Sequence, residues 1–380
     1  MNIRRVLLST DAVGGVWDFT LELARGLSEY GVEVVLVTLG PPPDDARRAD
    51  ARAMPGLRLH ESAFRLEWMQ QPWADVACSG GWLQWLARIY RPDIVHLNQF
   101  SHGARDWPAP TVVAGHSCVC SWFDAVHGQA PGPEWRAYRQ AVRRGLAGAD
   151  IVTAPSAAMR RALLAHYDAP ADLRVVYNGR RATDFPPSPL RPRILAVGRL
   201  WDPAKNLDAL TRIADRLDWP VRLIGPDQDP DHGPEGRRLR AAGVEHRAPM
   251  RGPALAREFA EAGIYALPAR YEPFGLSALE AALAGCALVL GDIPSLREIW
   301  GDAASYVPPD DDAALADVLQ QLSRNPDRRE QWARRARSRA LSYSAAVMTR
   351  RYLDVYREAS KRAAARAQAA PCESFSSITR

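Results

Sequence analysis

The feature that most constrains this chain is an alternation of short apolar runs and amphipathic helical stretches. Runs rich in valine, isoleucine and leucine occupy residues 5–9 and 33–39, and residues 16–30 between them have apolar side chains at helical spacing. This alternation is typical of βαβ units, whose strands form a parallel sheet. It also predicts strands at residues 94–97, 111–114 and 151–154 and helices at residues 81–90 and 134–148.

The alternation stops and starts again, which divides the chain in two. Residues 178–192 contain an Asn-Gly pair and four prolines, and proline at this density prevents both helix and β-ladder. We therefore predict two successive α/β domains, each doubly wound, with a ligand cleft between them. In the second part the pattern predicts strands at residues 193–197, 221–224, 264–267 and 287–290, and helices at residues 206–217, 276–284, 313–323 and within 328–369.

Composition excludes several classes of protein. The 380 residues contain no run of about 18 apolar side chains, and the first apolar run is too short for a signal peptide, so we expect a cytoplasmic chain. The five cysteines are sparse, and Cys118 and Cys120 have no second pair with which to complete a zinc site. The simplest interpretation is a reduced chain without a metal.

The charge is uneven along the chain. The net charge is +5, whereas residues 327–366 carry +8, from twelve basic minus four acidic side chains. Such a region is typical of a solvated helix face, and contact with an anionic membrane is the alternative. No aromatic residues interleave with a basic motif as in single-strand-binding proteins, so we predict no nucleic-acid partner.

The loop after the first predicted strand contains Gly14 and Gly15 directly before a helix. Glycines there let the backbone approach a ligand, and the helix N-terminus favours an anion. A dinucleotide site would need G-x-G-x-x-G here and an acid at the end of the second strand, and the sequence has neither, so NAD is disfavoured. A tight turn without a ligand is the alternative.

The loop after the first strand of the second part offers Gly198, Arg199 and Lys205 just before a helix. It lacks the P-loop pattern. Two cations six residues apart nevertheless suit a diphosphate, because arginine binds it as a fork and lysine as a point charge. Lys205 is one of two lysines among 49 basic residues, which favours a function over the alternative of an ordinary exposed lysine.

The most informative loop follows the strand predicted at residues 264–267. It contains Glu272, then Gly275 and Leu276 at the start of a helix, and Glu280 about one turn inside that helix. Free N–H groups at the helix start can hold a phosphate or a sugar hydroxyl. The two carboxylates can reach different ends of an elongated ligand, although a simple pair on a helix surface is the alternative.

Together these loops resemble the retaining nucleotide-sugar glycosyltransferases of family 4, which have the two-domain GT-B architecture. The E-x7-E element runs from Glu272 to Glu280 as EPFGLSALE, a highly specific form, and the segment from Gly198 to Lys205 matches the diphosphate loop. The similarity extends over about residues 3–360, nearly the whole chain.

The resemblance implies a GT-B fold in which two Rossmann-like domains face each other across a cleft. Residues 1–183 would form the acceptor domain and residues 184–345 the donor domain. A C-terminal helix at residues 346–366 would pack back on the first domain, and we expect residues 367–380 to be a disordered tail. Arg180-Arg181 departs from the apolar-acidic pair that the family usually has after Asn-Gly.

The resemblance also implies roles for single residues. Glu280 would accept hydrogen bonds from the ribose hydroxyls of the donor, and Arg199 and Lys205 would neutralise the leaving diphosphate. Glu272 would lie near the donor sugar. The other substrate-contacting positions on this interpretation are Gly14, Gly15, Gly198, Phe274, Gly275 and Leu276.

His116 is the histidine that the resemblance places near the donor sugar. It follows the strand predicted at residues 111–114, although Ser117 stands where the family often has aspartate. A buried structural histidine is the alternative. We rank three other histidines of this half below it: His96, His102 and His127.

The chemistry implied is retaining transfer of a hexosyl group from a UDP- or GDP-sugar to a hydroxyl acceptor, which would be a saccharide, a lipid-linked molecule or a small molecule. No metal and no cofactor are expected, and we interpret the acids at residues 227–229 and 310–312 as loop acids. A nucleotide-sugar epimerase and an inactive sugar-nucleotide binder are the alternatives. The tryptophan-rich stretch at residues 64–85 is the candidate for part of the acceptor wall.

Overall fold

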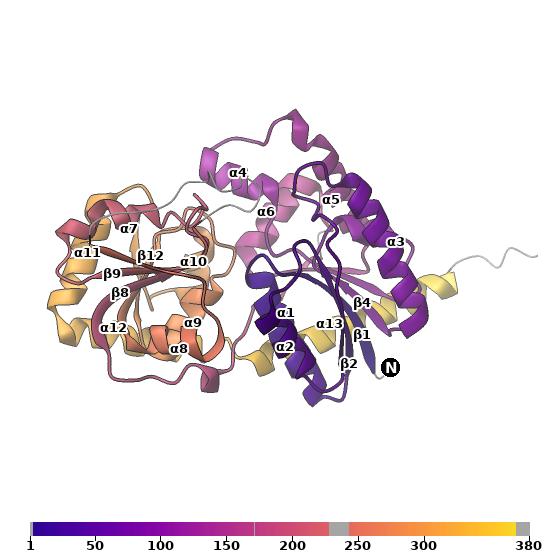
Figure 1. Cartoon of the computed structure of the whole chain (residues 1–380). Helices are drawn as coiled ribbons and strands as arrows, with labels where there is room; N and C mark the ends of the chain where they lie inside the picture. Colours follow the sequence, from indigo (N-terminus) through magenta and orange to yellow (C-terminus); the bar gives the residue numbers. More distant parts are fainter. Residues whose placement is uncertain (1–2, 171, 228–242, 370–380) are drawn as a thin grey trace, which may run out of the picture.

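The computed structural model describes residues 3–170, 172–227 and 243–369, which form two parallel β-sheets covered by helices (Figure 1). Within these residues the first sheet has the strand order β3-β2-β1-β4-β5-β6-β7 and the second the order β10-β9-β8-β11-β12-β13. Every strand pairing in both sheets is parallel. The prediction of two Rossmann-like α/β domains is confirmed.

The first sheet and its helices occupy the chain up to the proline-rich segment. In chain order these elements are β1 (Arg5–Asp11), α1 (Gly15–Glu29), β2 (Glu33–Leu39), α2 (Asp45–Arg52), β3 (Leu57–His60), α3 (Trp73–Tyr90), β4 (Ile94–Leu97), η1 (Ser101–Ala104), β5 (Thr111–Ala114), α4 (Val119–His127), η2 (Pro133–Trp135), α5 (Arg136–Gly148), β6 (Ile151–Ala154), α6 (Ala157–Tyr167) and β7 (Arg174–Val175).

The second sheet and the C-terminal helices follow. Their elements are η3 (Ala182–Asp184), β8 (Arg191–Val197), α7 (Asp208–Ile213), η4 (Ala214–Arg216), β9 (Val221–Ile224), β10 (Val244–Arg247), α8 (Gly252–Glu261), β11 (Ala262–Leu267), α9 (Leu276–Ala284), β12 (Ala287–Gly291), α10 (Pro294–Trp300), β13 (Ser305–Val307), α11 (Asp312–Arg324), α12 (Pro326–Ala340) and α13 (Ala345–Ala369).

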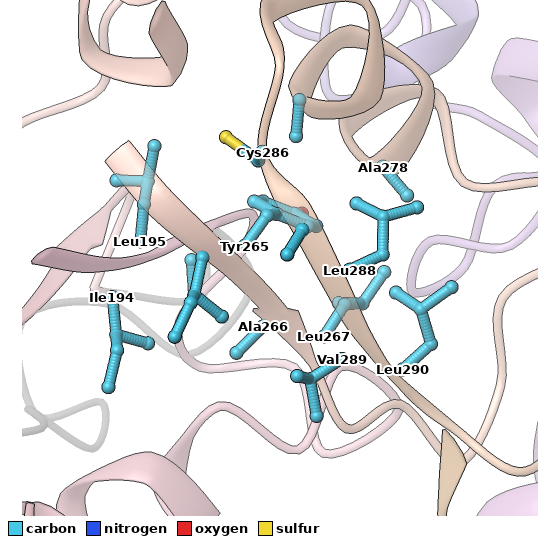
Figure 2. Packing of buried hydrophobic residues seen from close by; sticks show 14 of the residues in the cluster. Ile194, Leu195, Tyr265, Ala266, Leu267, Ala278, Cys286, Leu288, Val289 and Leu290 are labelled. Carbon is cyan, nitrogen blue, oxygen red and sulfur yellow. The ribbon is translucent and has the colours of Figure 1, made fainter. Parts of the chain in front are cut away.

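The central strands are buried on both faces, which explains their nearly continuous apolar sequence. Every residue of β4, β5, β6, β11 and β12 is buried. Figure 2 shows this core in the second sheet, where Tyr265 of β11 lies between Ile194 and Leu195 of β8 on one side and Leu288 of β12 on the other. Such burial fixes the register of the strands, and therefore the places where their carboxyl ends leave the sheet.

The last helix, α13, returns to the first sheet and packs against α1 (Figure 1). A side chain at Gly26 of α1 would overlap Thr349 of α13, so glycine permits this close approach. The hydroxyl of Tyr356 is 2.8 Å from Nδ1 of the buried His96. The helix continues to Ala369, into the segment predicted as a tail, and residues 370–380 lie outside the described residues.

The predicted strands of the first sheet match the structure closely, and the helix predicted at residues 81–90 is longer, since α3 begins at Trp73. The pattern missed α2, β3, α4, α6 and β7 in the first part and β10, α8, α10 and β13 in the second. The helix predicted at residues 206–217 is shorter, because it is α7 followed by η4. The domain limits at residues 183 and 345 stay a prediction. None of the helices in the described parts of the chain has the length and apolar character needed to span a membrane.

Candidate active site between the two sheets

The carboxyl ends of the two sheets face each other, and two glycines let them come close. A Cβ atom on Gly14 would lie 3.0 Å from the guanidinium of Arg199, and one on Gly15 would lie 3.5 Å from Leu276. Gly14 is the N-cap of α1 and Leu276 is the first residue of α9. The three loops singled out in the sequence therefore meet at one place.

The cation Arg199 is fixed by a buried acid. Its Nε and one terminal nitrogen lie 3.2 and 2.5 Å from Oδ2 of Asp202. Asp202 Oδ1 accepts from the backbone N–H of Ala204 at 2.9 Å. Burial acts to raise the pKa of Asp202, but Arg199 and Lys205 hold it below its usual value. Arg199 therefore has a fixed position facing the first sheet.

Lys205 and Glu272 form an ion pair at the start of α9. The ammonium lies 2.5 Å from Oε2 of Glu272, and both side chains are largely buried. The other oxygen, Oε1, accepts from the backbone N–H of Gly275 at 2.9 Å. Gly275 has φ = 90°, the left-handed conformation that favours glycine. Glu272 therefore binds the backbone at the start of α9 with one oxygen and Lys205 with the other.

Glu280 is paired with an arginine that sequence reasoning treated only as a departure from the family pattern. Nε of Arg180 donates a hydrogen bond to Oε1 of Glu280 at 2.7 Å, and a terminal nitrogen of Arg180 lies 2.7 Å from the same oxygen. Burial raises the pKa of Glu280 to about 7, although Arg180 acts to lower it. No hydrogen bond from the described residues reaches Oε2, so this oxygen remains for a ligand.

The double arginine connects the proline-rich linker to α1. Arg180 also donates to the backbone carbonyl of Asp18 at 3.0 Å and lies 3.5 Å from Glu22. Arg181 pairs with Glu22 at 3.0 Å and with Glu29 at 2.7 Å. The two arginines that depart from the family pattern therefore connect the linker to α1 and to Glu280 of α9.

His116 lies at the carboxyl end of β5, in van der Waals contact with Phe19, whose ring centroid is 4.5 Å away. Its Nε2 is 2.8 Å from Oδ1 of Asn98. The amide nitrogen of Asn98 donates to the carbonyl of Ser9, so Oδ1 is an acceptor and His116 carries its proton on Nε2. Burial lowers the pKa of His116 to about 4, which leaves Nδ1 as a neutral acceptor.

The three histidines ranked below His116 have structural surroundings or lie at the surface. His96 is fully buried beside Tyr356, and burial lowers its pKa to about 3. His102 lies 3.0 Å from the hydroxyl of Ser79 and is also buried. His127 is exposed at the end of α4.

A cavity of about 750 Å³, called here the charged cavity, lies between α1, residues 183–188 and α8. Arg180 and Glu280 line it, and so do Asp18 and Arg251, which form an ion pair across the cleft. It is large enough for a nucleoside and lies beside the Glu280 carboxylate.

A second cavity of about 370 Å³, called the aromatic cavity, lies on the other side of the Gly14–Arg199 contact. It joins the carboxyl ends of β1, β4 and β5 to the loop after β8. Its aromatic lining includes Phe100, Trp68, Trp122, Phe123, Trp135, Tyr138 and Trp201, and its polar lining includes Asp11, Glu67, Asn98, Gln99, His116, Arg199 and Asp202.

The tryptophan prediction is only partly matched by the position of these side chains. Of the stretch at residues 64–85, Trp68 lines the aromatic cavity, whereas Trp85 is 54% exposed on α3. Sequence reasoning did not single out Trp122 or Trp201 as wall residues. Their positions shortly after His116 and Arg199 are the signal that could have identified them.

The described residues contain no cluster of acids, histidines and cysteines suited to a metal ion. Asp310 pairs with Arg270, Asp311 caps α11 by accepting from Ala314 at 2.8 Å, and Asp312 pairs with Arg212. These three acids have structural partners. Of the other acidic loop, residues 228–229 lie outside the described residues.

Known sequences match both halves of this chain. A family model described as Glycosyltransferase Family 4 matches residues 13–182, and one described as Glycosyl transferases group 1 matches residues 191–325. A D-inositol 3-phosphate glycosyltransferase of Xylanimonas cellulosilytica is 29% identical, with 94% of each chain covered. A protein of the same name from Mycobacterium avium is 30% identical, with 83% of this chain and 82% of that one covered.

Solved structures share the fold. A sucrose-phosphate synthase from Thermosynechococcus elongatus has a TM-score of 0.76 at 18% identity, covering 93% of this chain and 98% of that one. Anabaena HepE, solved in complex with UDP-glucose, has a TM-score of 0.72 at 16% identity, covering 93% and 99%. At these identities the likeness concerns the GT-B fold alone.

Proposed function

We propose that this chain, which belongs to glycosyltransferase family 4, transfers a hexosyl group from a UDP- or GDP-sugar to a hydroxyl acceptor with retention of the anomeric configuration. The observation that carries the proposal is the meeting of Gly14, Arg199 and the start of α9 between two cavities. A donor could lie across this contact, with its nucleoside in the charged cavity and its sugar toward the aromatic cavity.

The diphosphate would bind where the fixed cations converge. Arg199 and Lys205 are already oriented by Asp202 and Glu272, so little reorganisation is needed when the phosphate oxygens arrive. The N–H groups at the start of α9 add a positive dipole end. As the bond to the sugar breaks, these groups would stabilise the charge that develops on the leaving diphosphate.

The ribose would bind Glu280. Arg180 occupies only Oε1, which orients the carboxylate and leaves Oε2 to accept hydrogen bonds from vicinal hydroxyls. The sugar would then lie near Glu272 and His116, whose Nδ1 can accept from a sugar hydroxyl. The leaving phosphate would take the acceptor's proton, so the reaction would need neither a dedicated protein base nor a metal.

Donor binding tests this proposal directly. Calorimetry against UDP, GDP, ADP and their hexose conjugates should reveal one preferred nucleotide, and Glu280→Ala and Arg199→Ala should each abolish that preference. Arg334→Ala is a matched arginine control, because Arg334 pairs only with the exposed Glu330 on α12 among the described residues. A folded wild-type protein that binds none of these nucleotides would contradict the proposal.

The same assays separate the alternatives. Incubating the donor alone and analysing its sugar by NMR would detect an epimerase, which converts the donor without an acceptor. Donor binding without turnover, across a broad acceptor panel, would instead support an inactive binder. For transfer, the anomeric coupling constant of the product compared with that of the donor decides between retention and inversion.

We also propose a cytoplasmic enzyme, for which contact of the basic helices α12 and α13 with an anionic membrane is the alternative to a solvated helix face. Several of their arginines are paired, as Arg334 is with Glu330 and Arg366 with Asp150, which reduces the charge available. Sedimentation with anionic and neutral liposomes at two salt concentrations is the test. Binding to anionic liposomes that decreases with salt supports the contact, and no binding at either concentration ends the idea.

A further inference from the structure

Among the described residues, the lining of the aromatic cavity contains one cation, Arg199, and three acidic side chains, Asp11, Glu67 and Asp202. The guanidinium of Arg199 is already bound to Asp202. In the proposed reaction, on which this inference rests, Arg199 is also the group that holds the donor diphosphate. No cation among the described lining residues is therefore left for a second anion.

The carboxylates of this cavity are fixed in place by backbone N–H groups. The two oxygens of Glu67 accept from the N–H groups of Phe100 and Ser101 at 2.9 and 2.7 Å, at the start of η1. Asp11 accepts from the N–H of Val13 at 2.9 Å. Burial raises the pKa of both Asp11 and Glu67. A phosphate monoester, which carries about −1.5 to −2 charges at neutral pH, would find no free cation among the described lining residues.

The remaining lining suits a ring with one apolar face and hydroxyl groups at its edge. Trp68, Trp122, Trp135 and Trp201 supply broad aromatic surfaces from both sides of the cleft. Such surfaces pack against the C–H face of a ring while its polar edge remains free to hydrogen-bond.

A polar group for that edge lies at the carboxyl end of β4, since Nδ1 of His116 is already assigned to the donor sugar. Gln99 is 4% exposed, and although its Oε1 accepts from Ser9, its Nε2 donates no hydrogen bond to the described residues. A buried amide donor without a partner is costly, so a ligand oxygen that reached it would be favoured.

We propose that the acceptor held in the aromatic cavity is an uncharged saccharide, stacked on these tryptophans, and that phosphorylated acceptors are excluded. The exclusion comes from the lining, because Arg199, the one cation among its described residues, is already bound to Asp202. Acceptor specificity in this chain is therefore set by aromatic surface and neutral hydrogen-bonding groups.

The test uses matched pairs of probes. Methyl glucoside, methyl mannoside and methyl galactoside are each compared with the corresponding 6-phosphate, and myo-inositol is compared with inositol 3-phosphate. Binding is followed by calorimetry and tryptophan fluorescence, on the free protein and with UDP or GDP present. We expect at least one uncharged glycoside to bind about tenfold or more tightly than its phosphate.

Substitutions inside and outside the aromatic cavity test whether the glycoside binds there. Trp122→Ala should weaken the bound glycoside about tenfold, whereas Trp85→Ala, which removes an exposed tryptophan of α3, should leave it unchanged. Phe123→Lys, which adds a cation to the lining, should improve binding of the phosphorylated partner.

Three outcomes would overturn the proposal: tighter binding of the phosphorylated member, no binding by any uncharged probe, or equal losses in Trp122→Ala and Trp85→Ala. Because the titrations are also run without nucleotide, they decide the acceptor class even where no nucleotide binds. If no nucleotide binds, the proposed donor is wrong, whereas the glycoside titrations still test the acceptor inference.

Discussion

The groups proposed to hold the donor and those that line the aromatic cavity are built in different ways. The donor groups come mainly from two short segments, residues 198–205 and 272–280, in which a strand end, a turn and a helix start follow one another. The aromatic cavity draws side chains from segments scattered between Asp11 and Asp202. Anion binding thus depends on local chain geometry, whereas the acceptor side depends on how distant segments pack.

Charge separates the two regions as well. On the donor side, cations and carboxylates form the pairs Arg199–Asp202, Lys205–Glu272 and Arg180–Glu280. Each pair holds one group in place for the ligand while neutralising it in the free protein. On the acceptor side the lining is largely aromatic, and the acids Glu67 and Asp11 accept hydrogen bonds from backbone N–H groups.

The largest effect should come from Arg180→Leu. This change leaves Glu280 buried without its partner, and breaking a buried ion pair on one side costs about 3–5 kcal/mol of stability. Urea unfolding at about pH 8 would measure it. Without Arg180 the pKa of Glu280 would rise further above its unfolded value, so the loss should be smaller at lower pH, where the folded protein takes up a proton.

The matched control for this prediction is the double variant Arg180→Leu/Glu280→Leu. It removes both charges, so most of the lost stability should return. Equal destabilisation by the single and the double variant would mean that the pair does not carry the effect. Arg180 would then act only through its contacts with α1.

The next largest effect concerns the cations of the diphosphate loop. Arg199→Ala and Lys205→Ala should each lower kcat about 100- to 1000-fold, because each removes a group aimed at charge that develops in the transition state. Each variant also leaves a buried acid, Asp202 or Glu272, without its partner, so urea unfolding should show a loss of stability beside the kinetic loss. Steady-state kinetics with the donor found by calorimetry gives the measurement, with Arg334→Ala as control. A loss confined to KM would instead assign the cation to ground-state binding.

These donor groups were predictable because their geometry is local. A strand that ends before Gly198 and a helix that starts after Gly275 are visible in the sequence, and they fix the place of Lys205 and Glu280 without knowledge of the rest of the fold. The Arg180–Glu280 pair was not predictable, because it joins residues 100 positions apart. The roles assigned to all these residues stay predictions.

A moderate effect should appear in the pH dependence of donor binding. Burial raises the pKa of Glu280 to about 7, and only the carboxylate accepts from both ribose hydroxyls. Between about pH 6 and pH 8 its ionised fraction rises roughly tenfold, so the donor KM should fall by about that factor. Glu280→Gln should have a flat profile over this range. A wild-type profile that is equally flat would show that Glu280 does not bind the ribose.

The raised pKa of Glu280 has the opposite effect on the stability of the free protein, which should fall as pH rises. A carboxyl whose pKa is higher in the folded than in the unfolded state stabilises the fold below its unfolded pKa, and this contribution disappears as pH rises through about 7. Donor binding should therefore strengthen over the range in which Glu280's contribution to stability weakens. The comparison of the two profiles distinguishes a ligand-binding carboxylate from a structural one.

The aromatic cavity was largely invisible in the sequence, for a physical reason. Tryptophan in a core and tryptophan in a ligand wall have the same local pattern, since both lie on half-buried surfaces. Only packing shows that Trp68 lines the cavity while Trp85 faces solvent. His116 was identifiable because a strand end positions it, although its hydrogen bond to Asn98 required the pairing of β4 with β5.

The smallest effect tests whether the two regions are coupled. The indole Nε1 of Trp122 is 3.3 Å from Oδ1 of Asp202, whose other oxygen holds Arg199. Trp122→Phe keeps an aromatic surface but removes this weak hydrogen bond, which is worth about 0.5–1 kcal/mol. We expect donor binding to weaken about two- to fivefold.

In a double-mutant cycle with Arg199→Ala this loss should disappear, because Trp122 would act on the donor only through Asp202 and Arg199. A loss that persists in the Arg199→Ala background would mean that Trp122 contacts the donor itself, and the division into a donor side and an acceptor side would then be wrong at this residue.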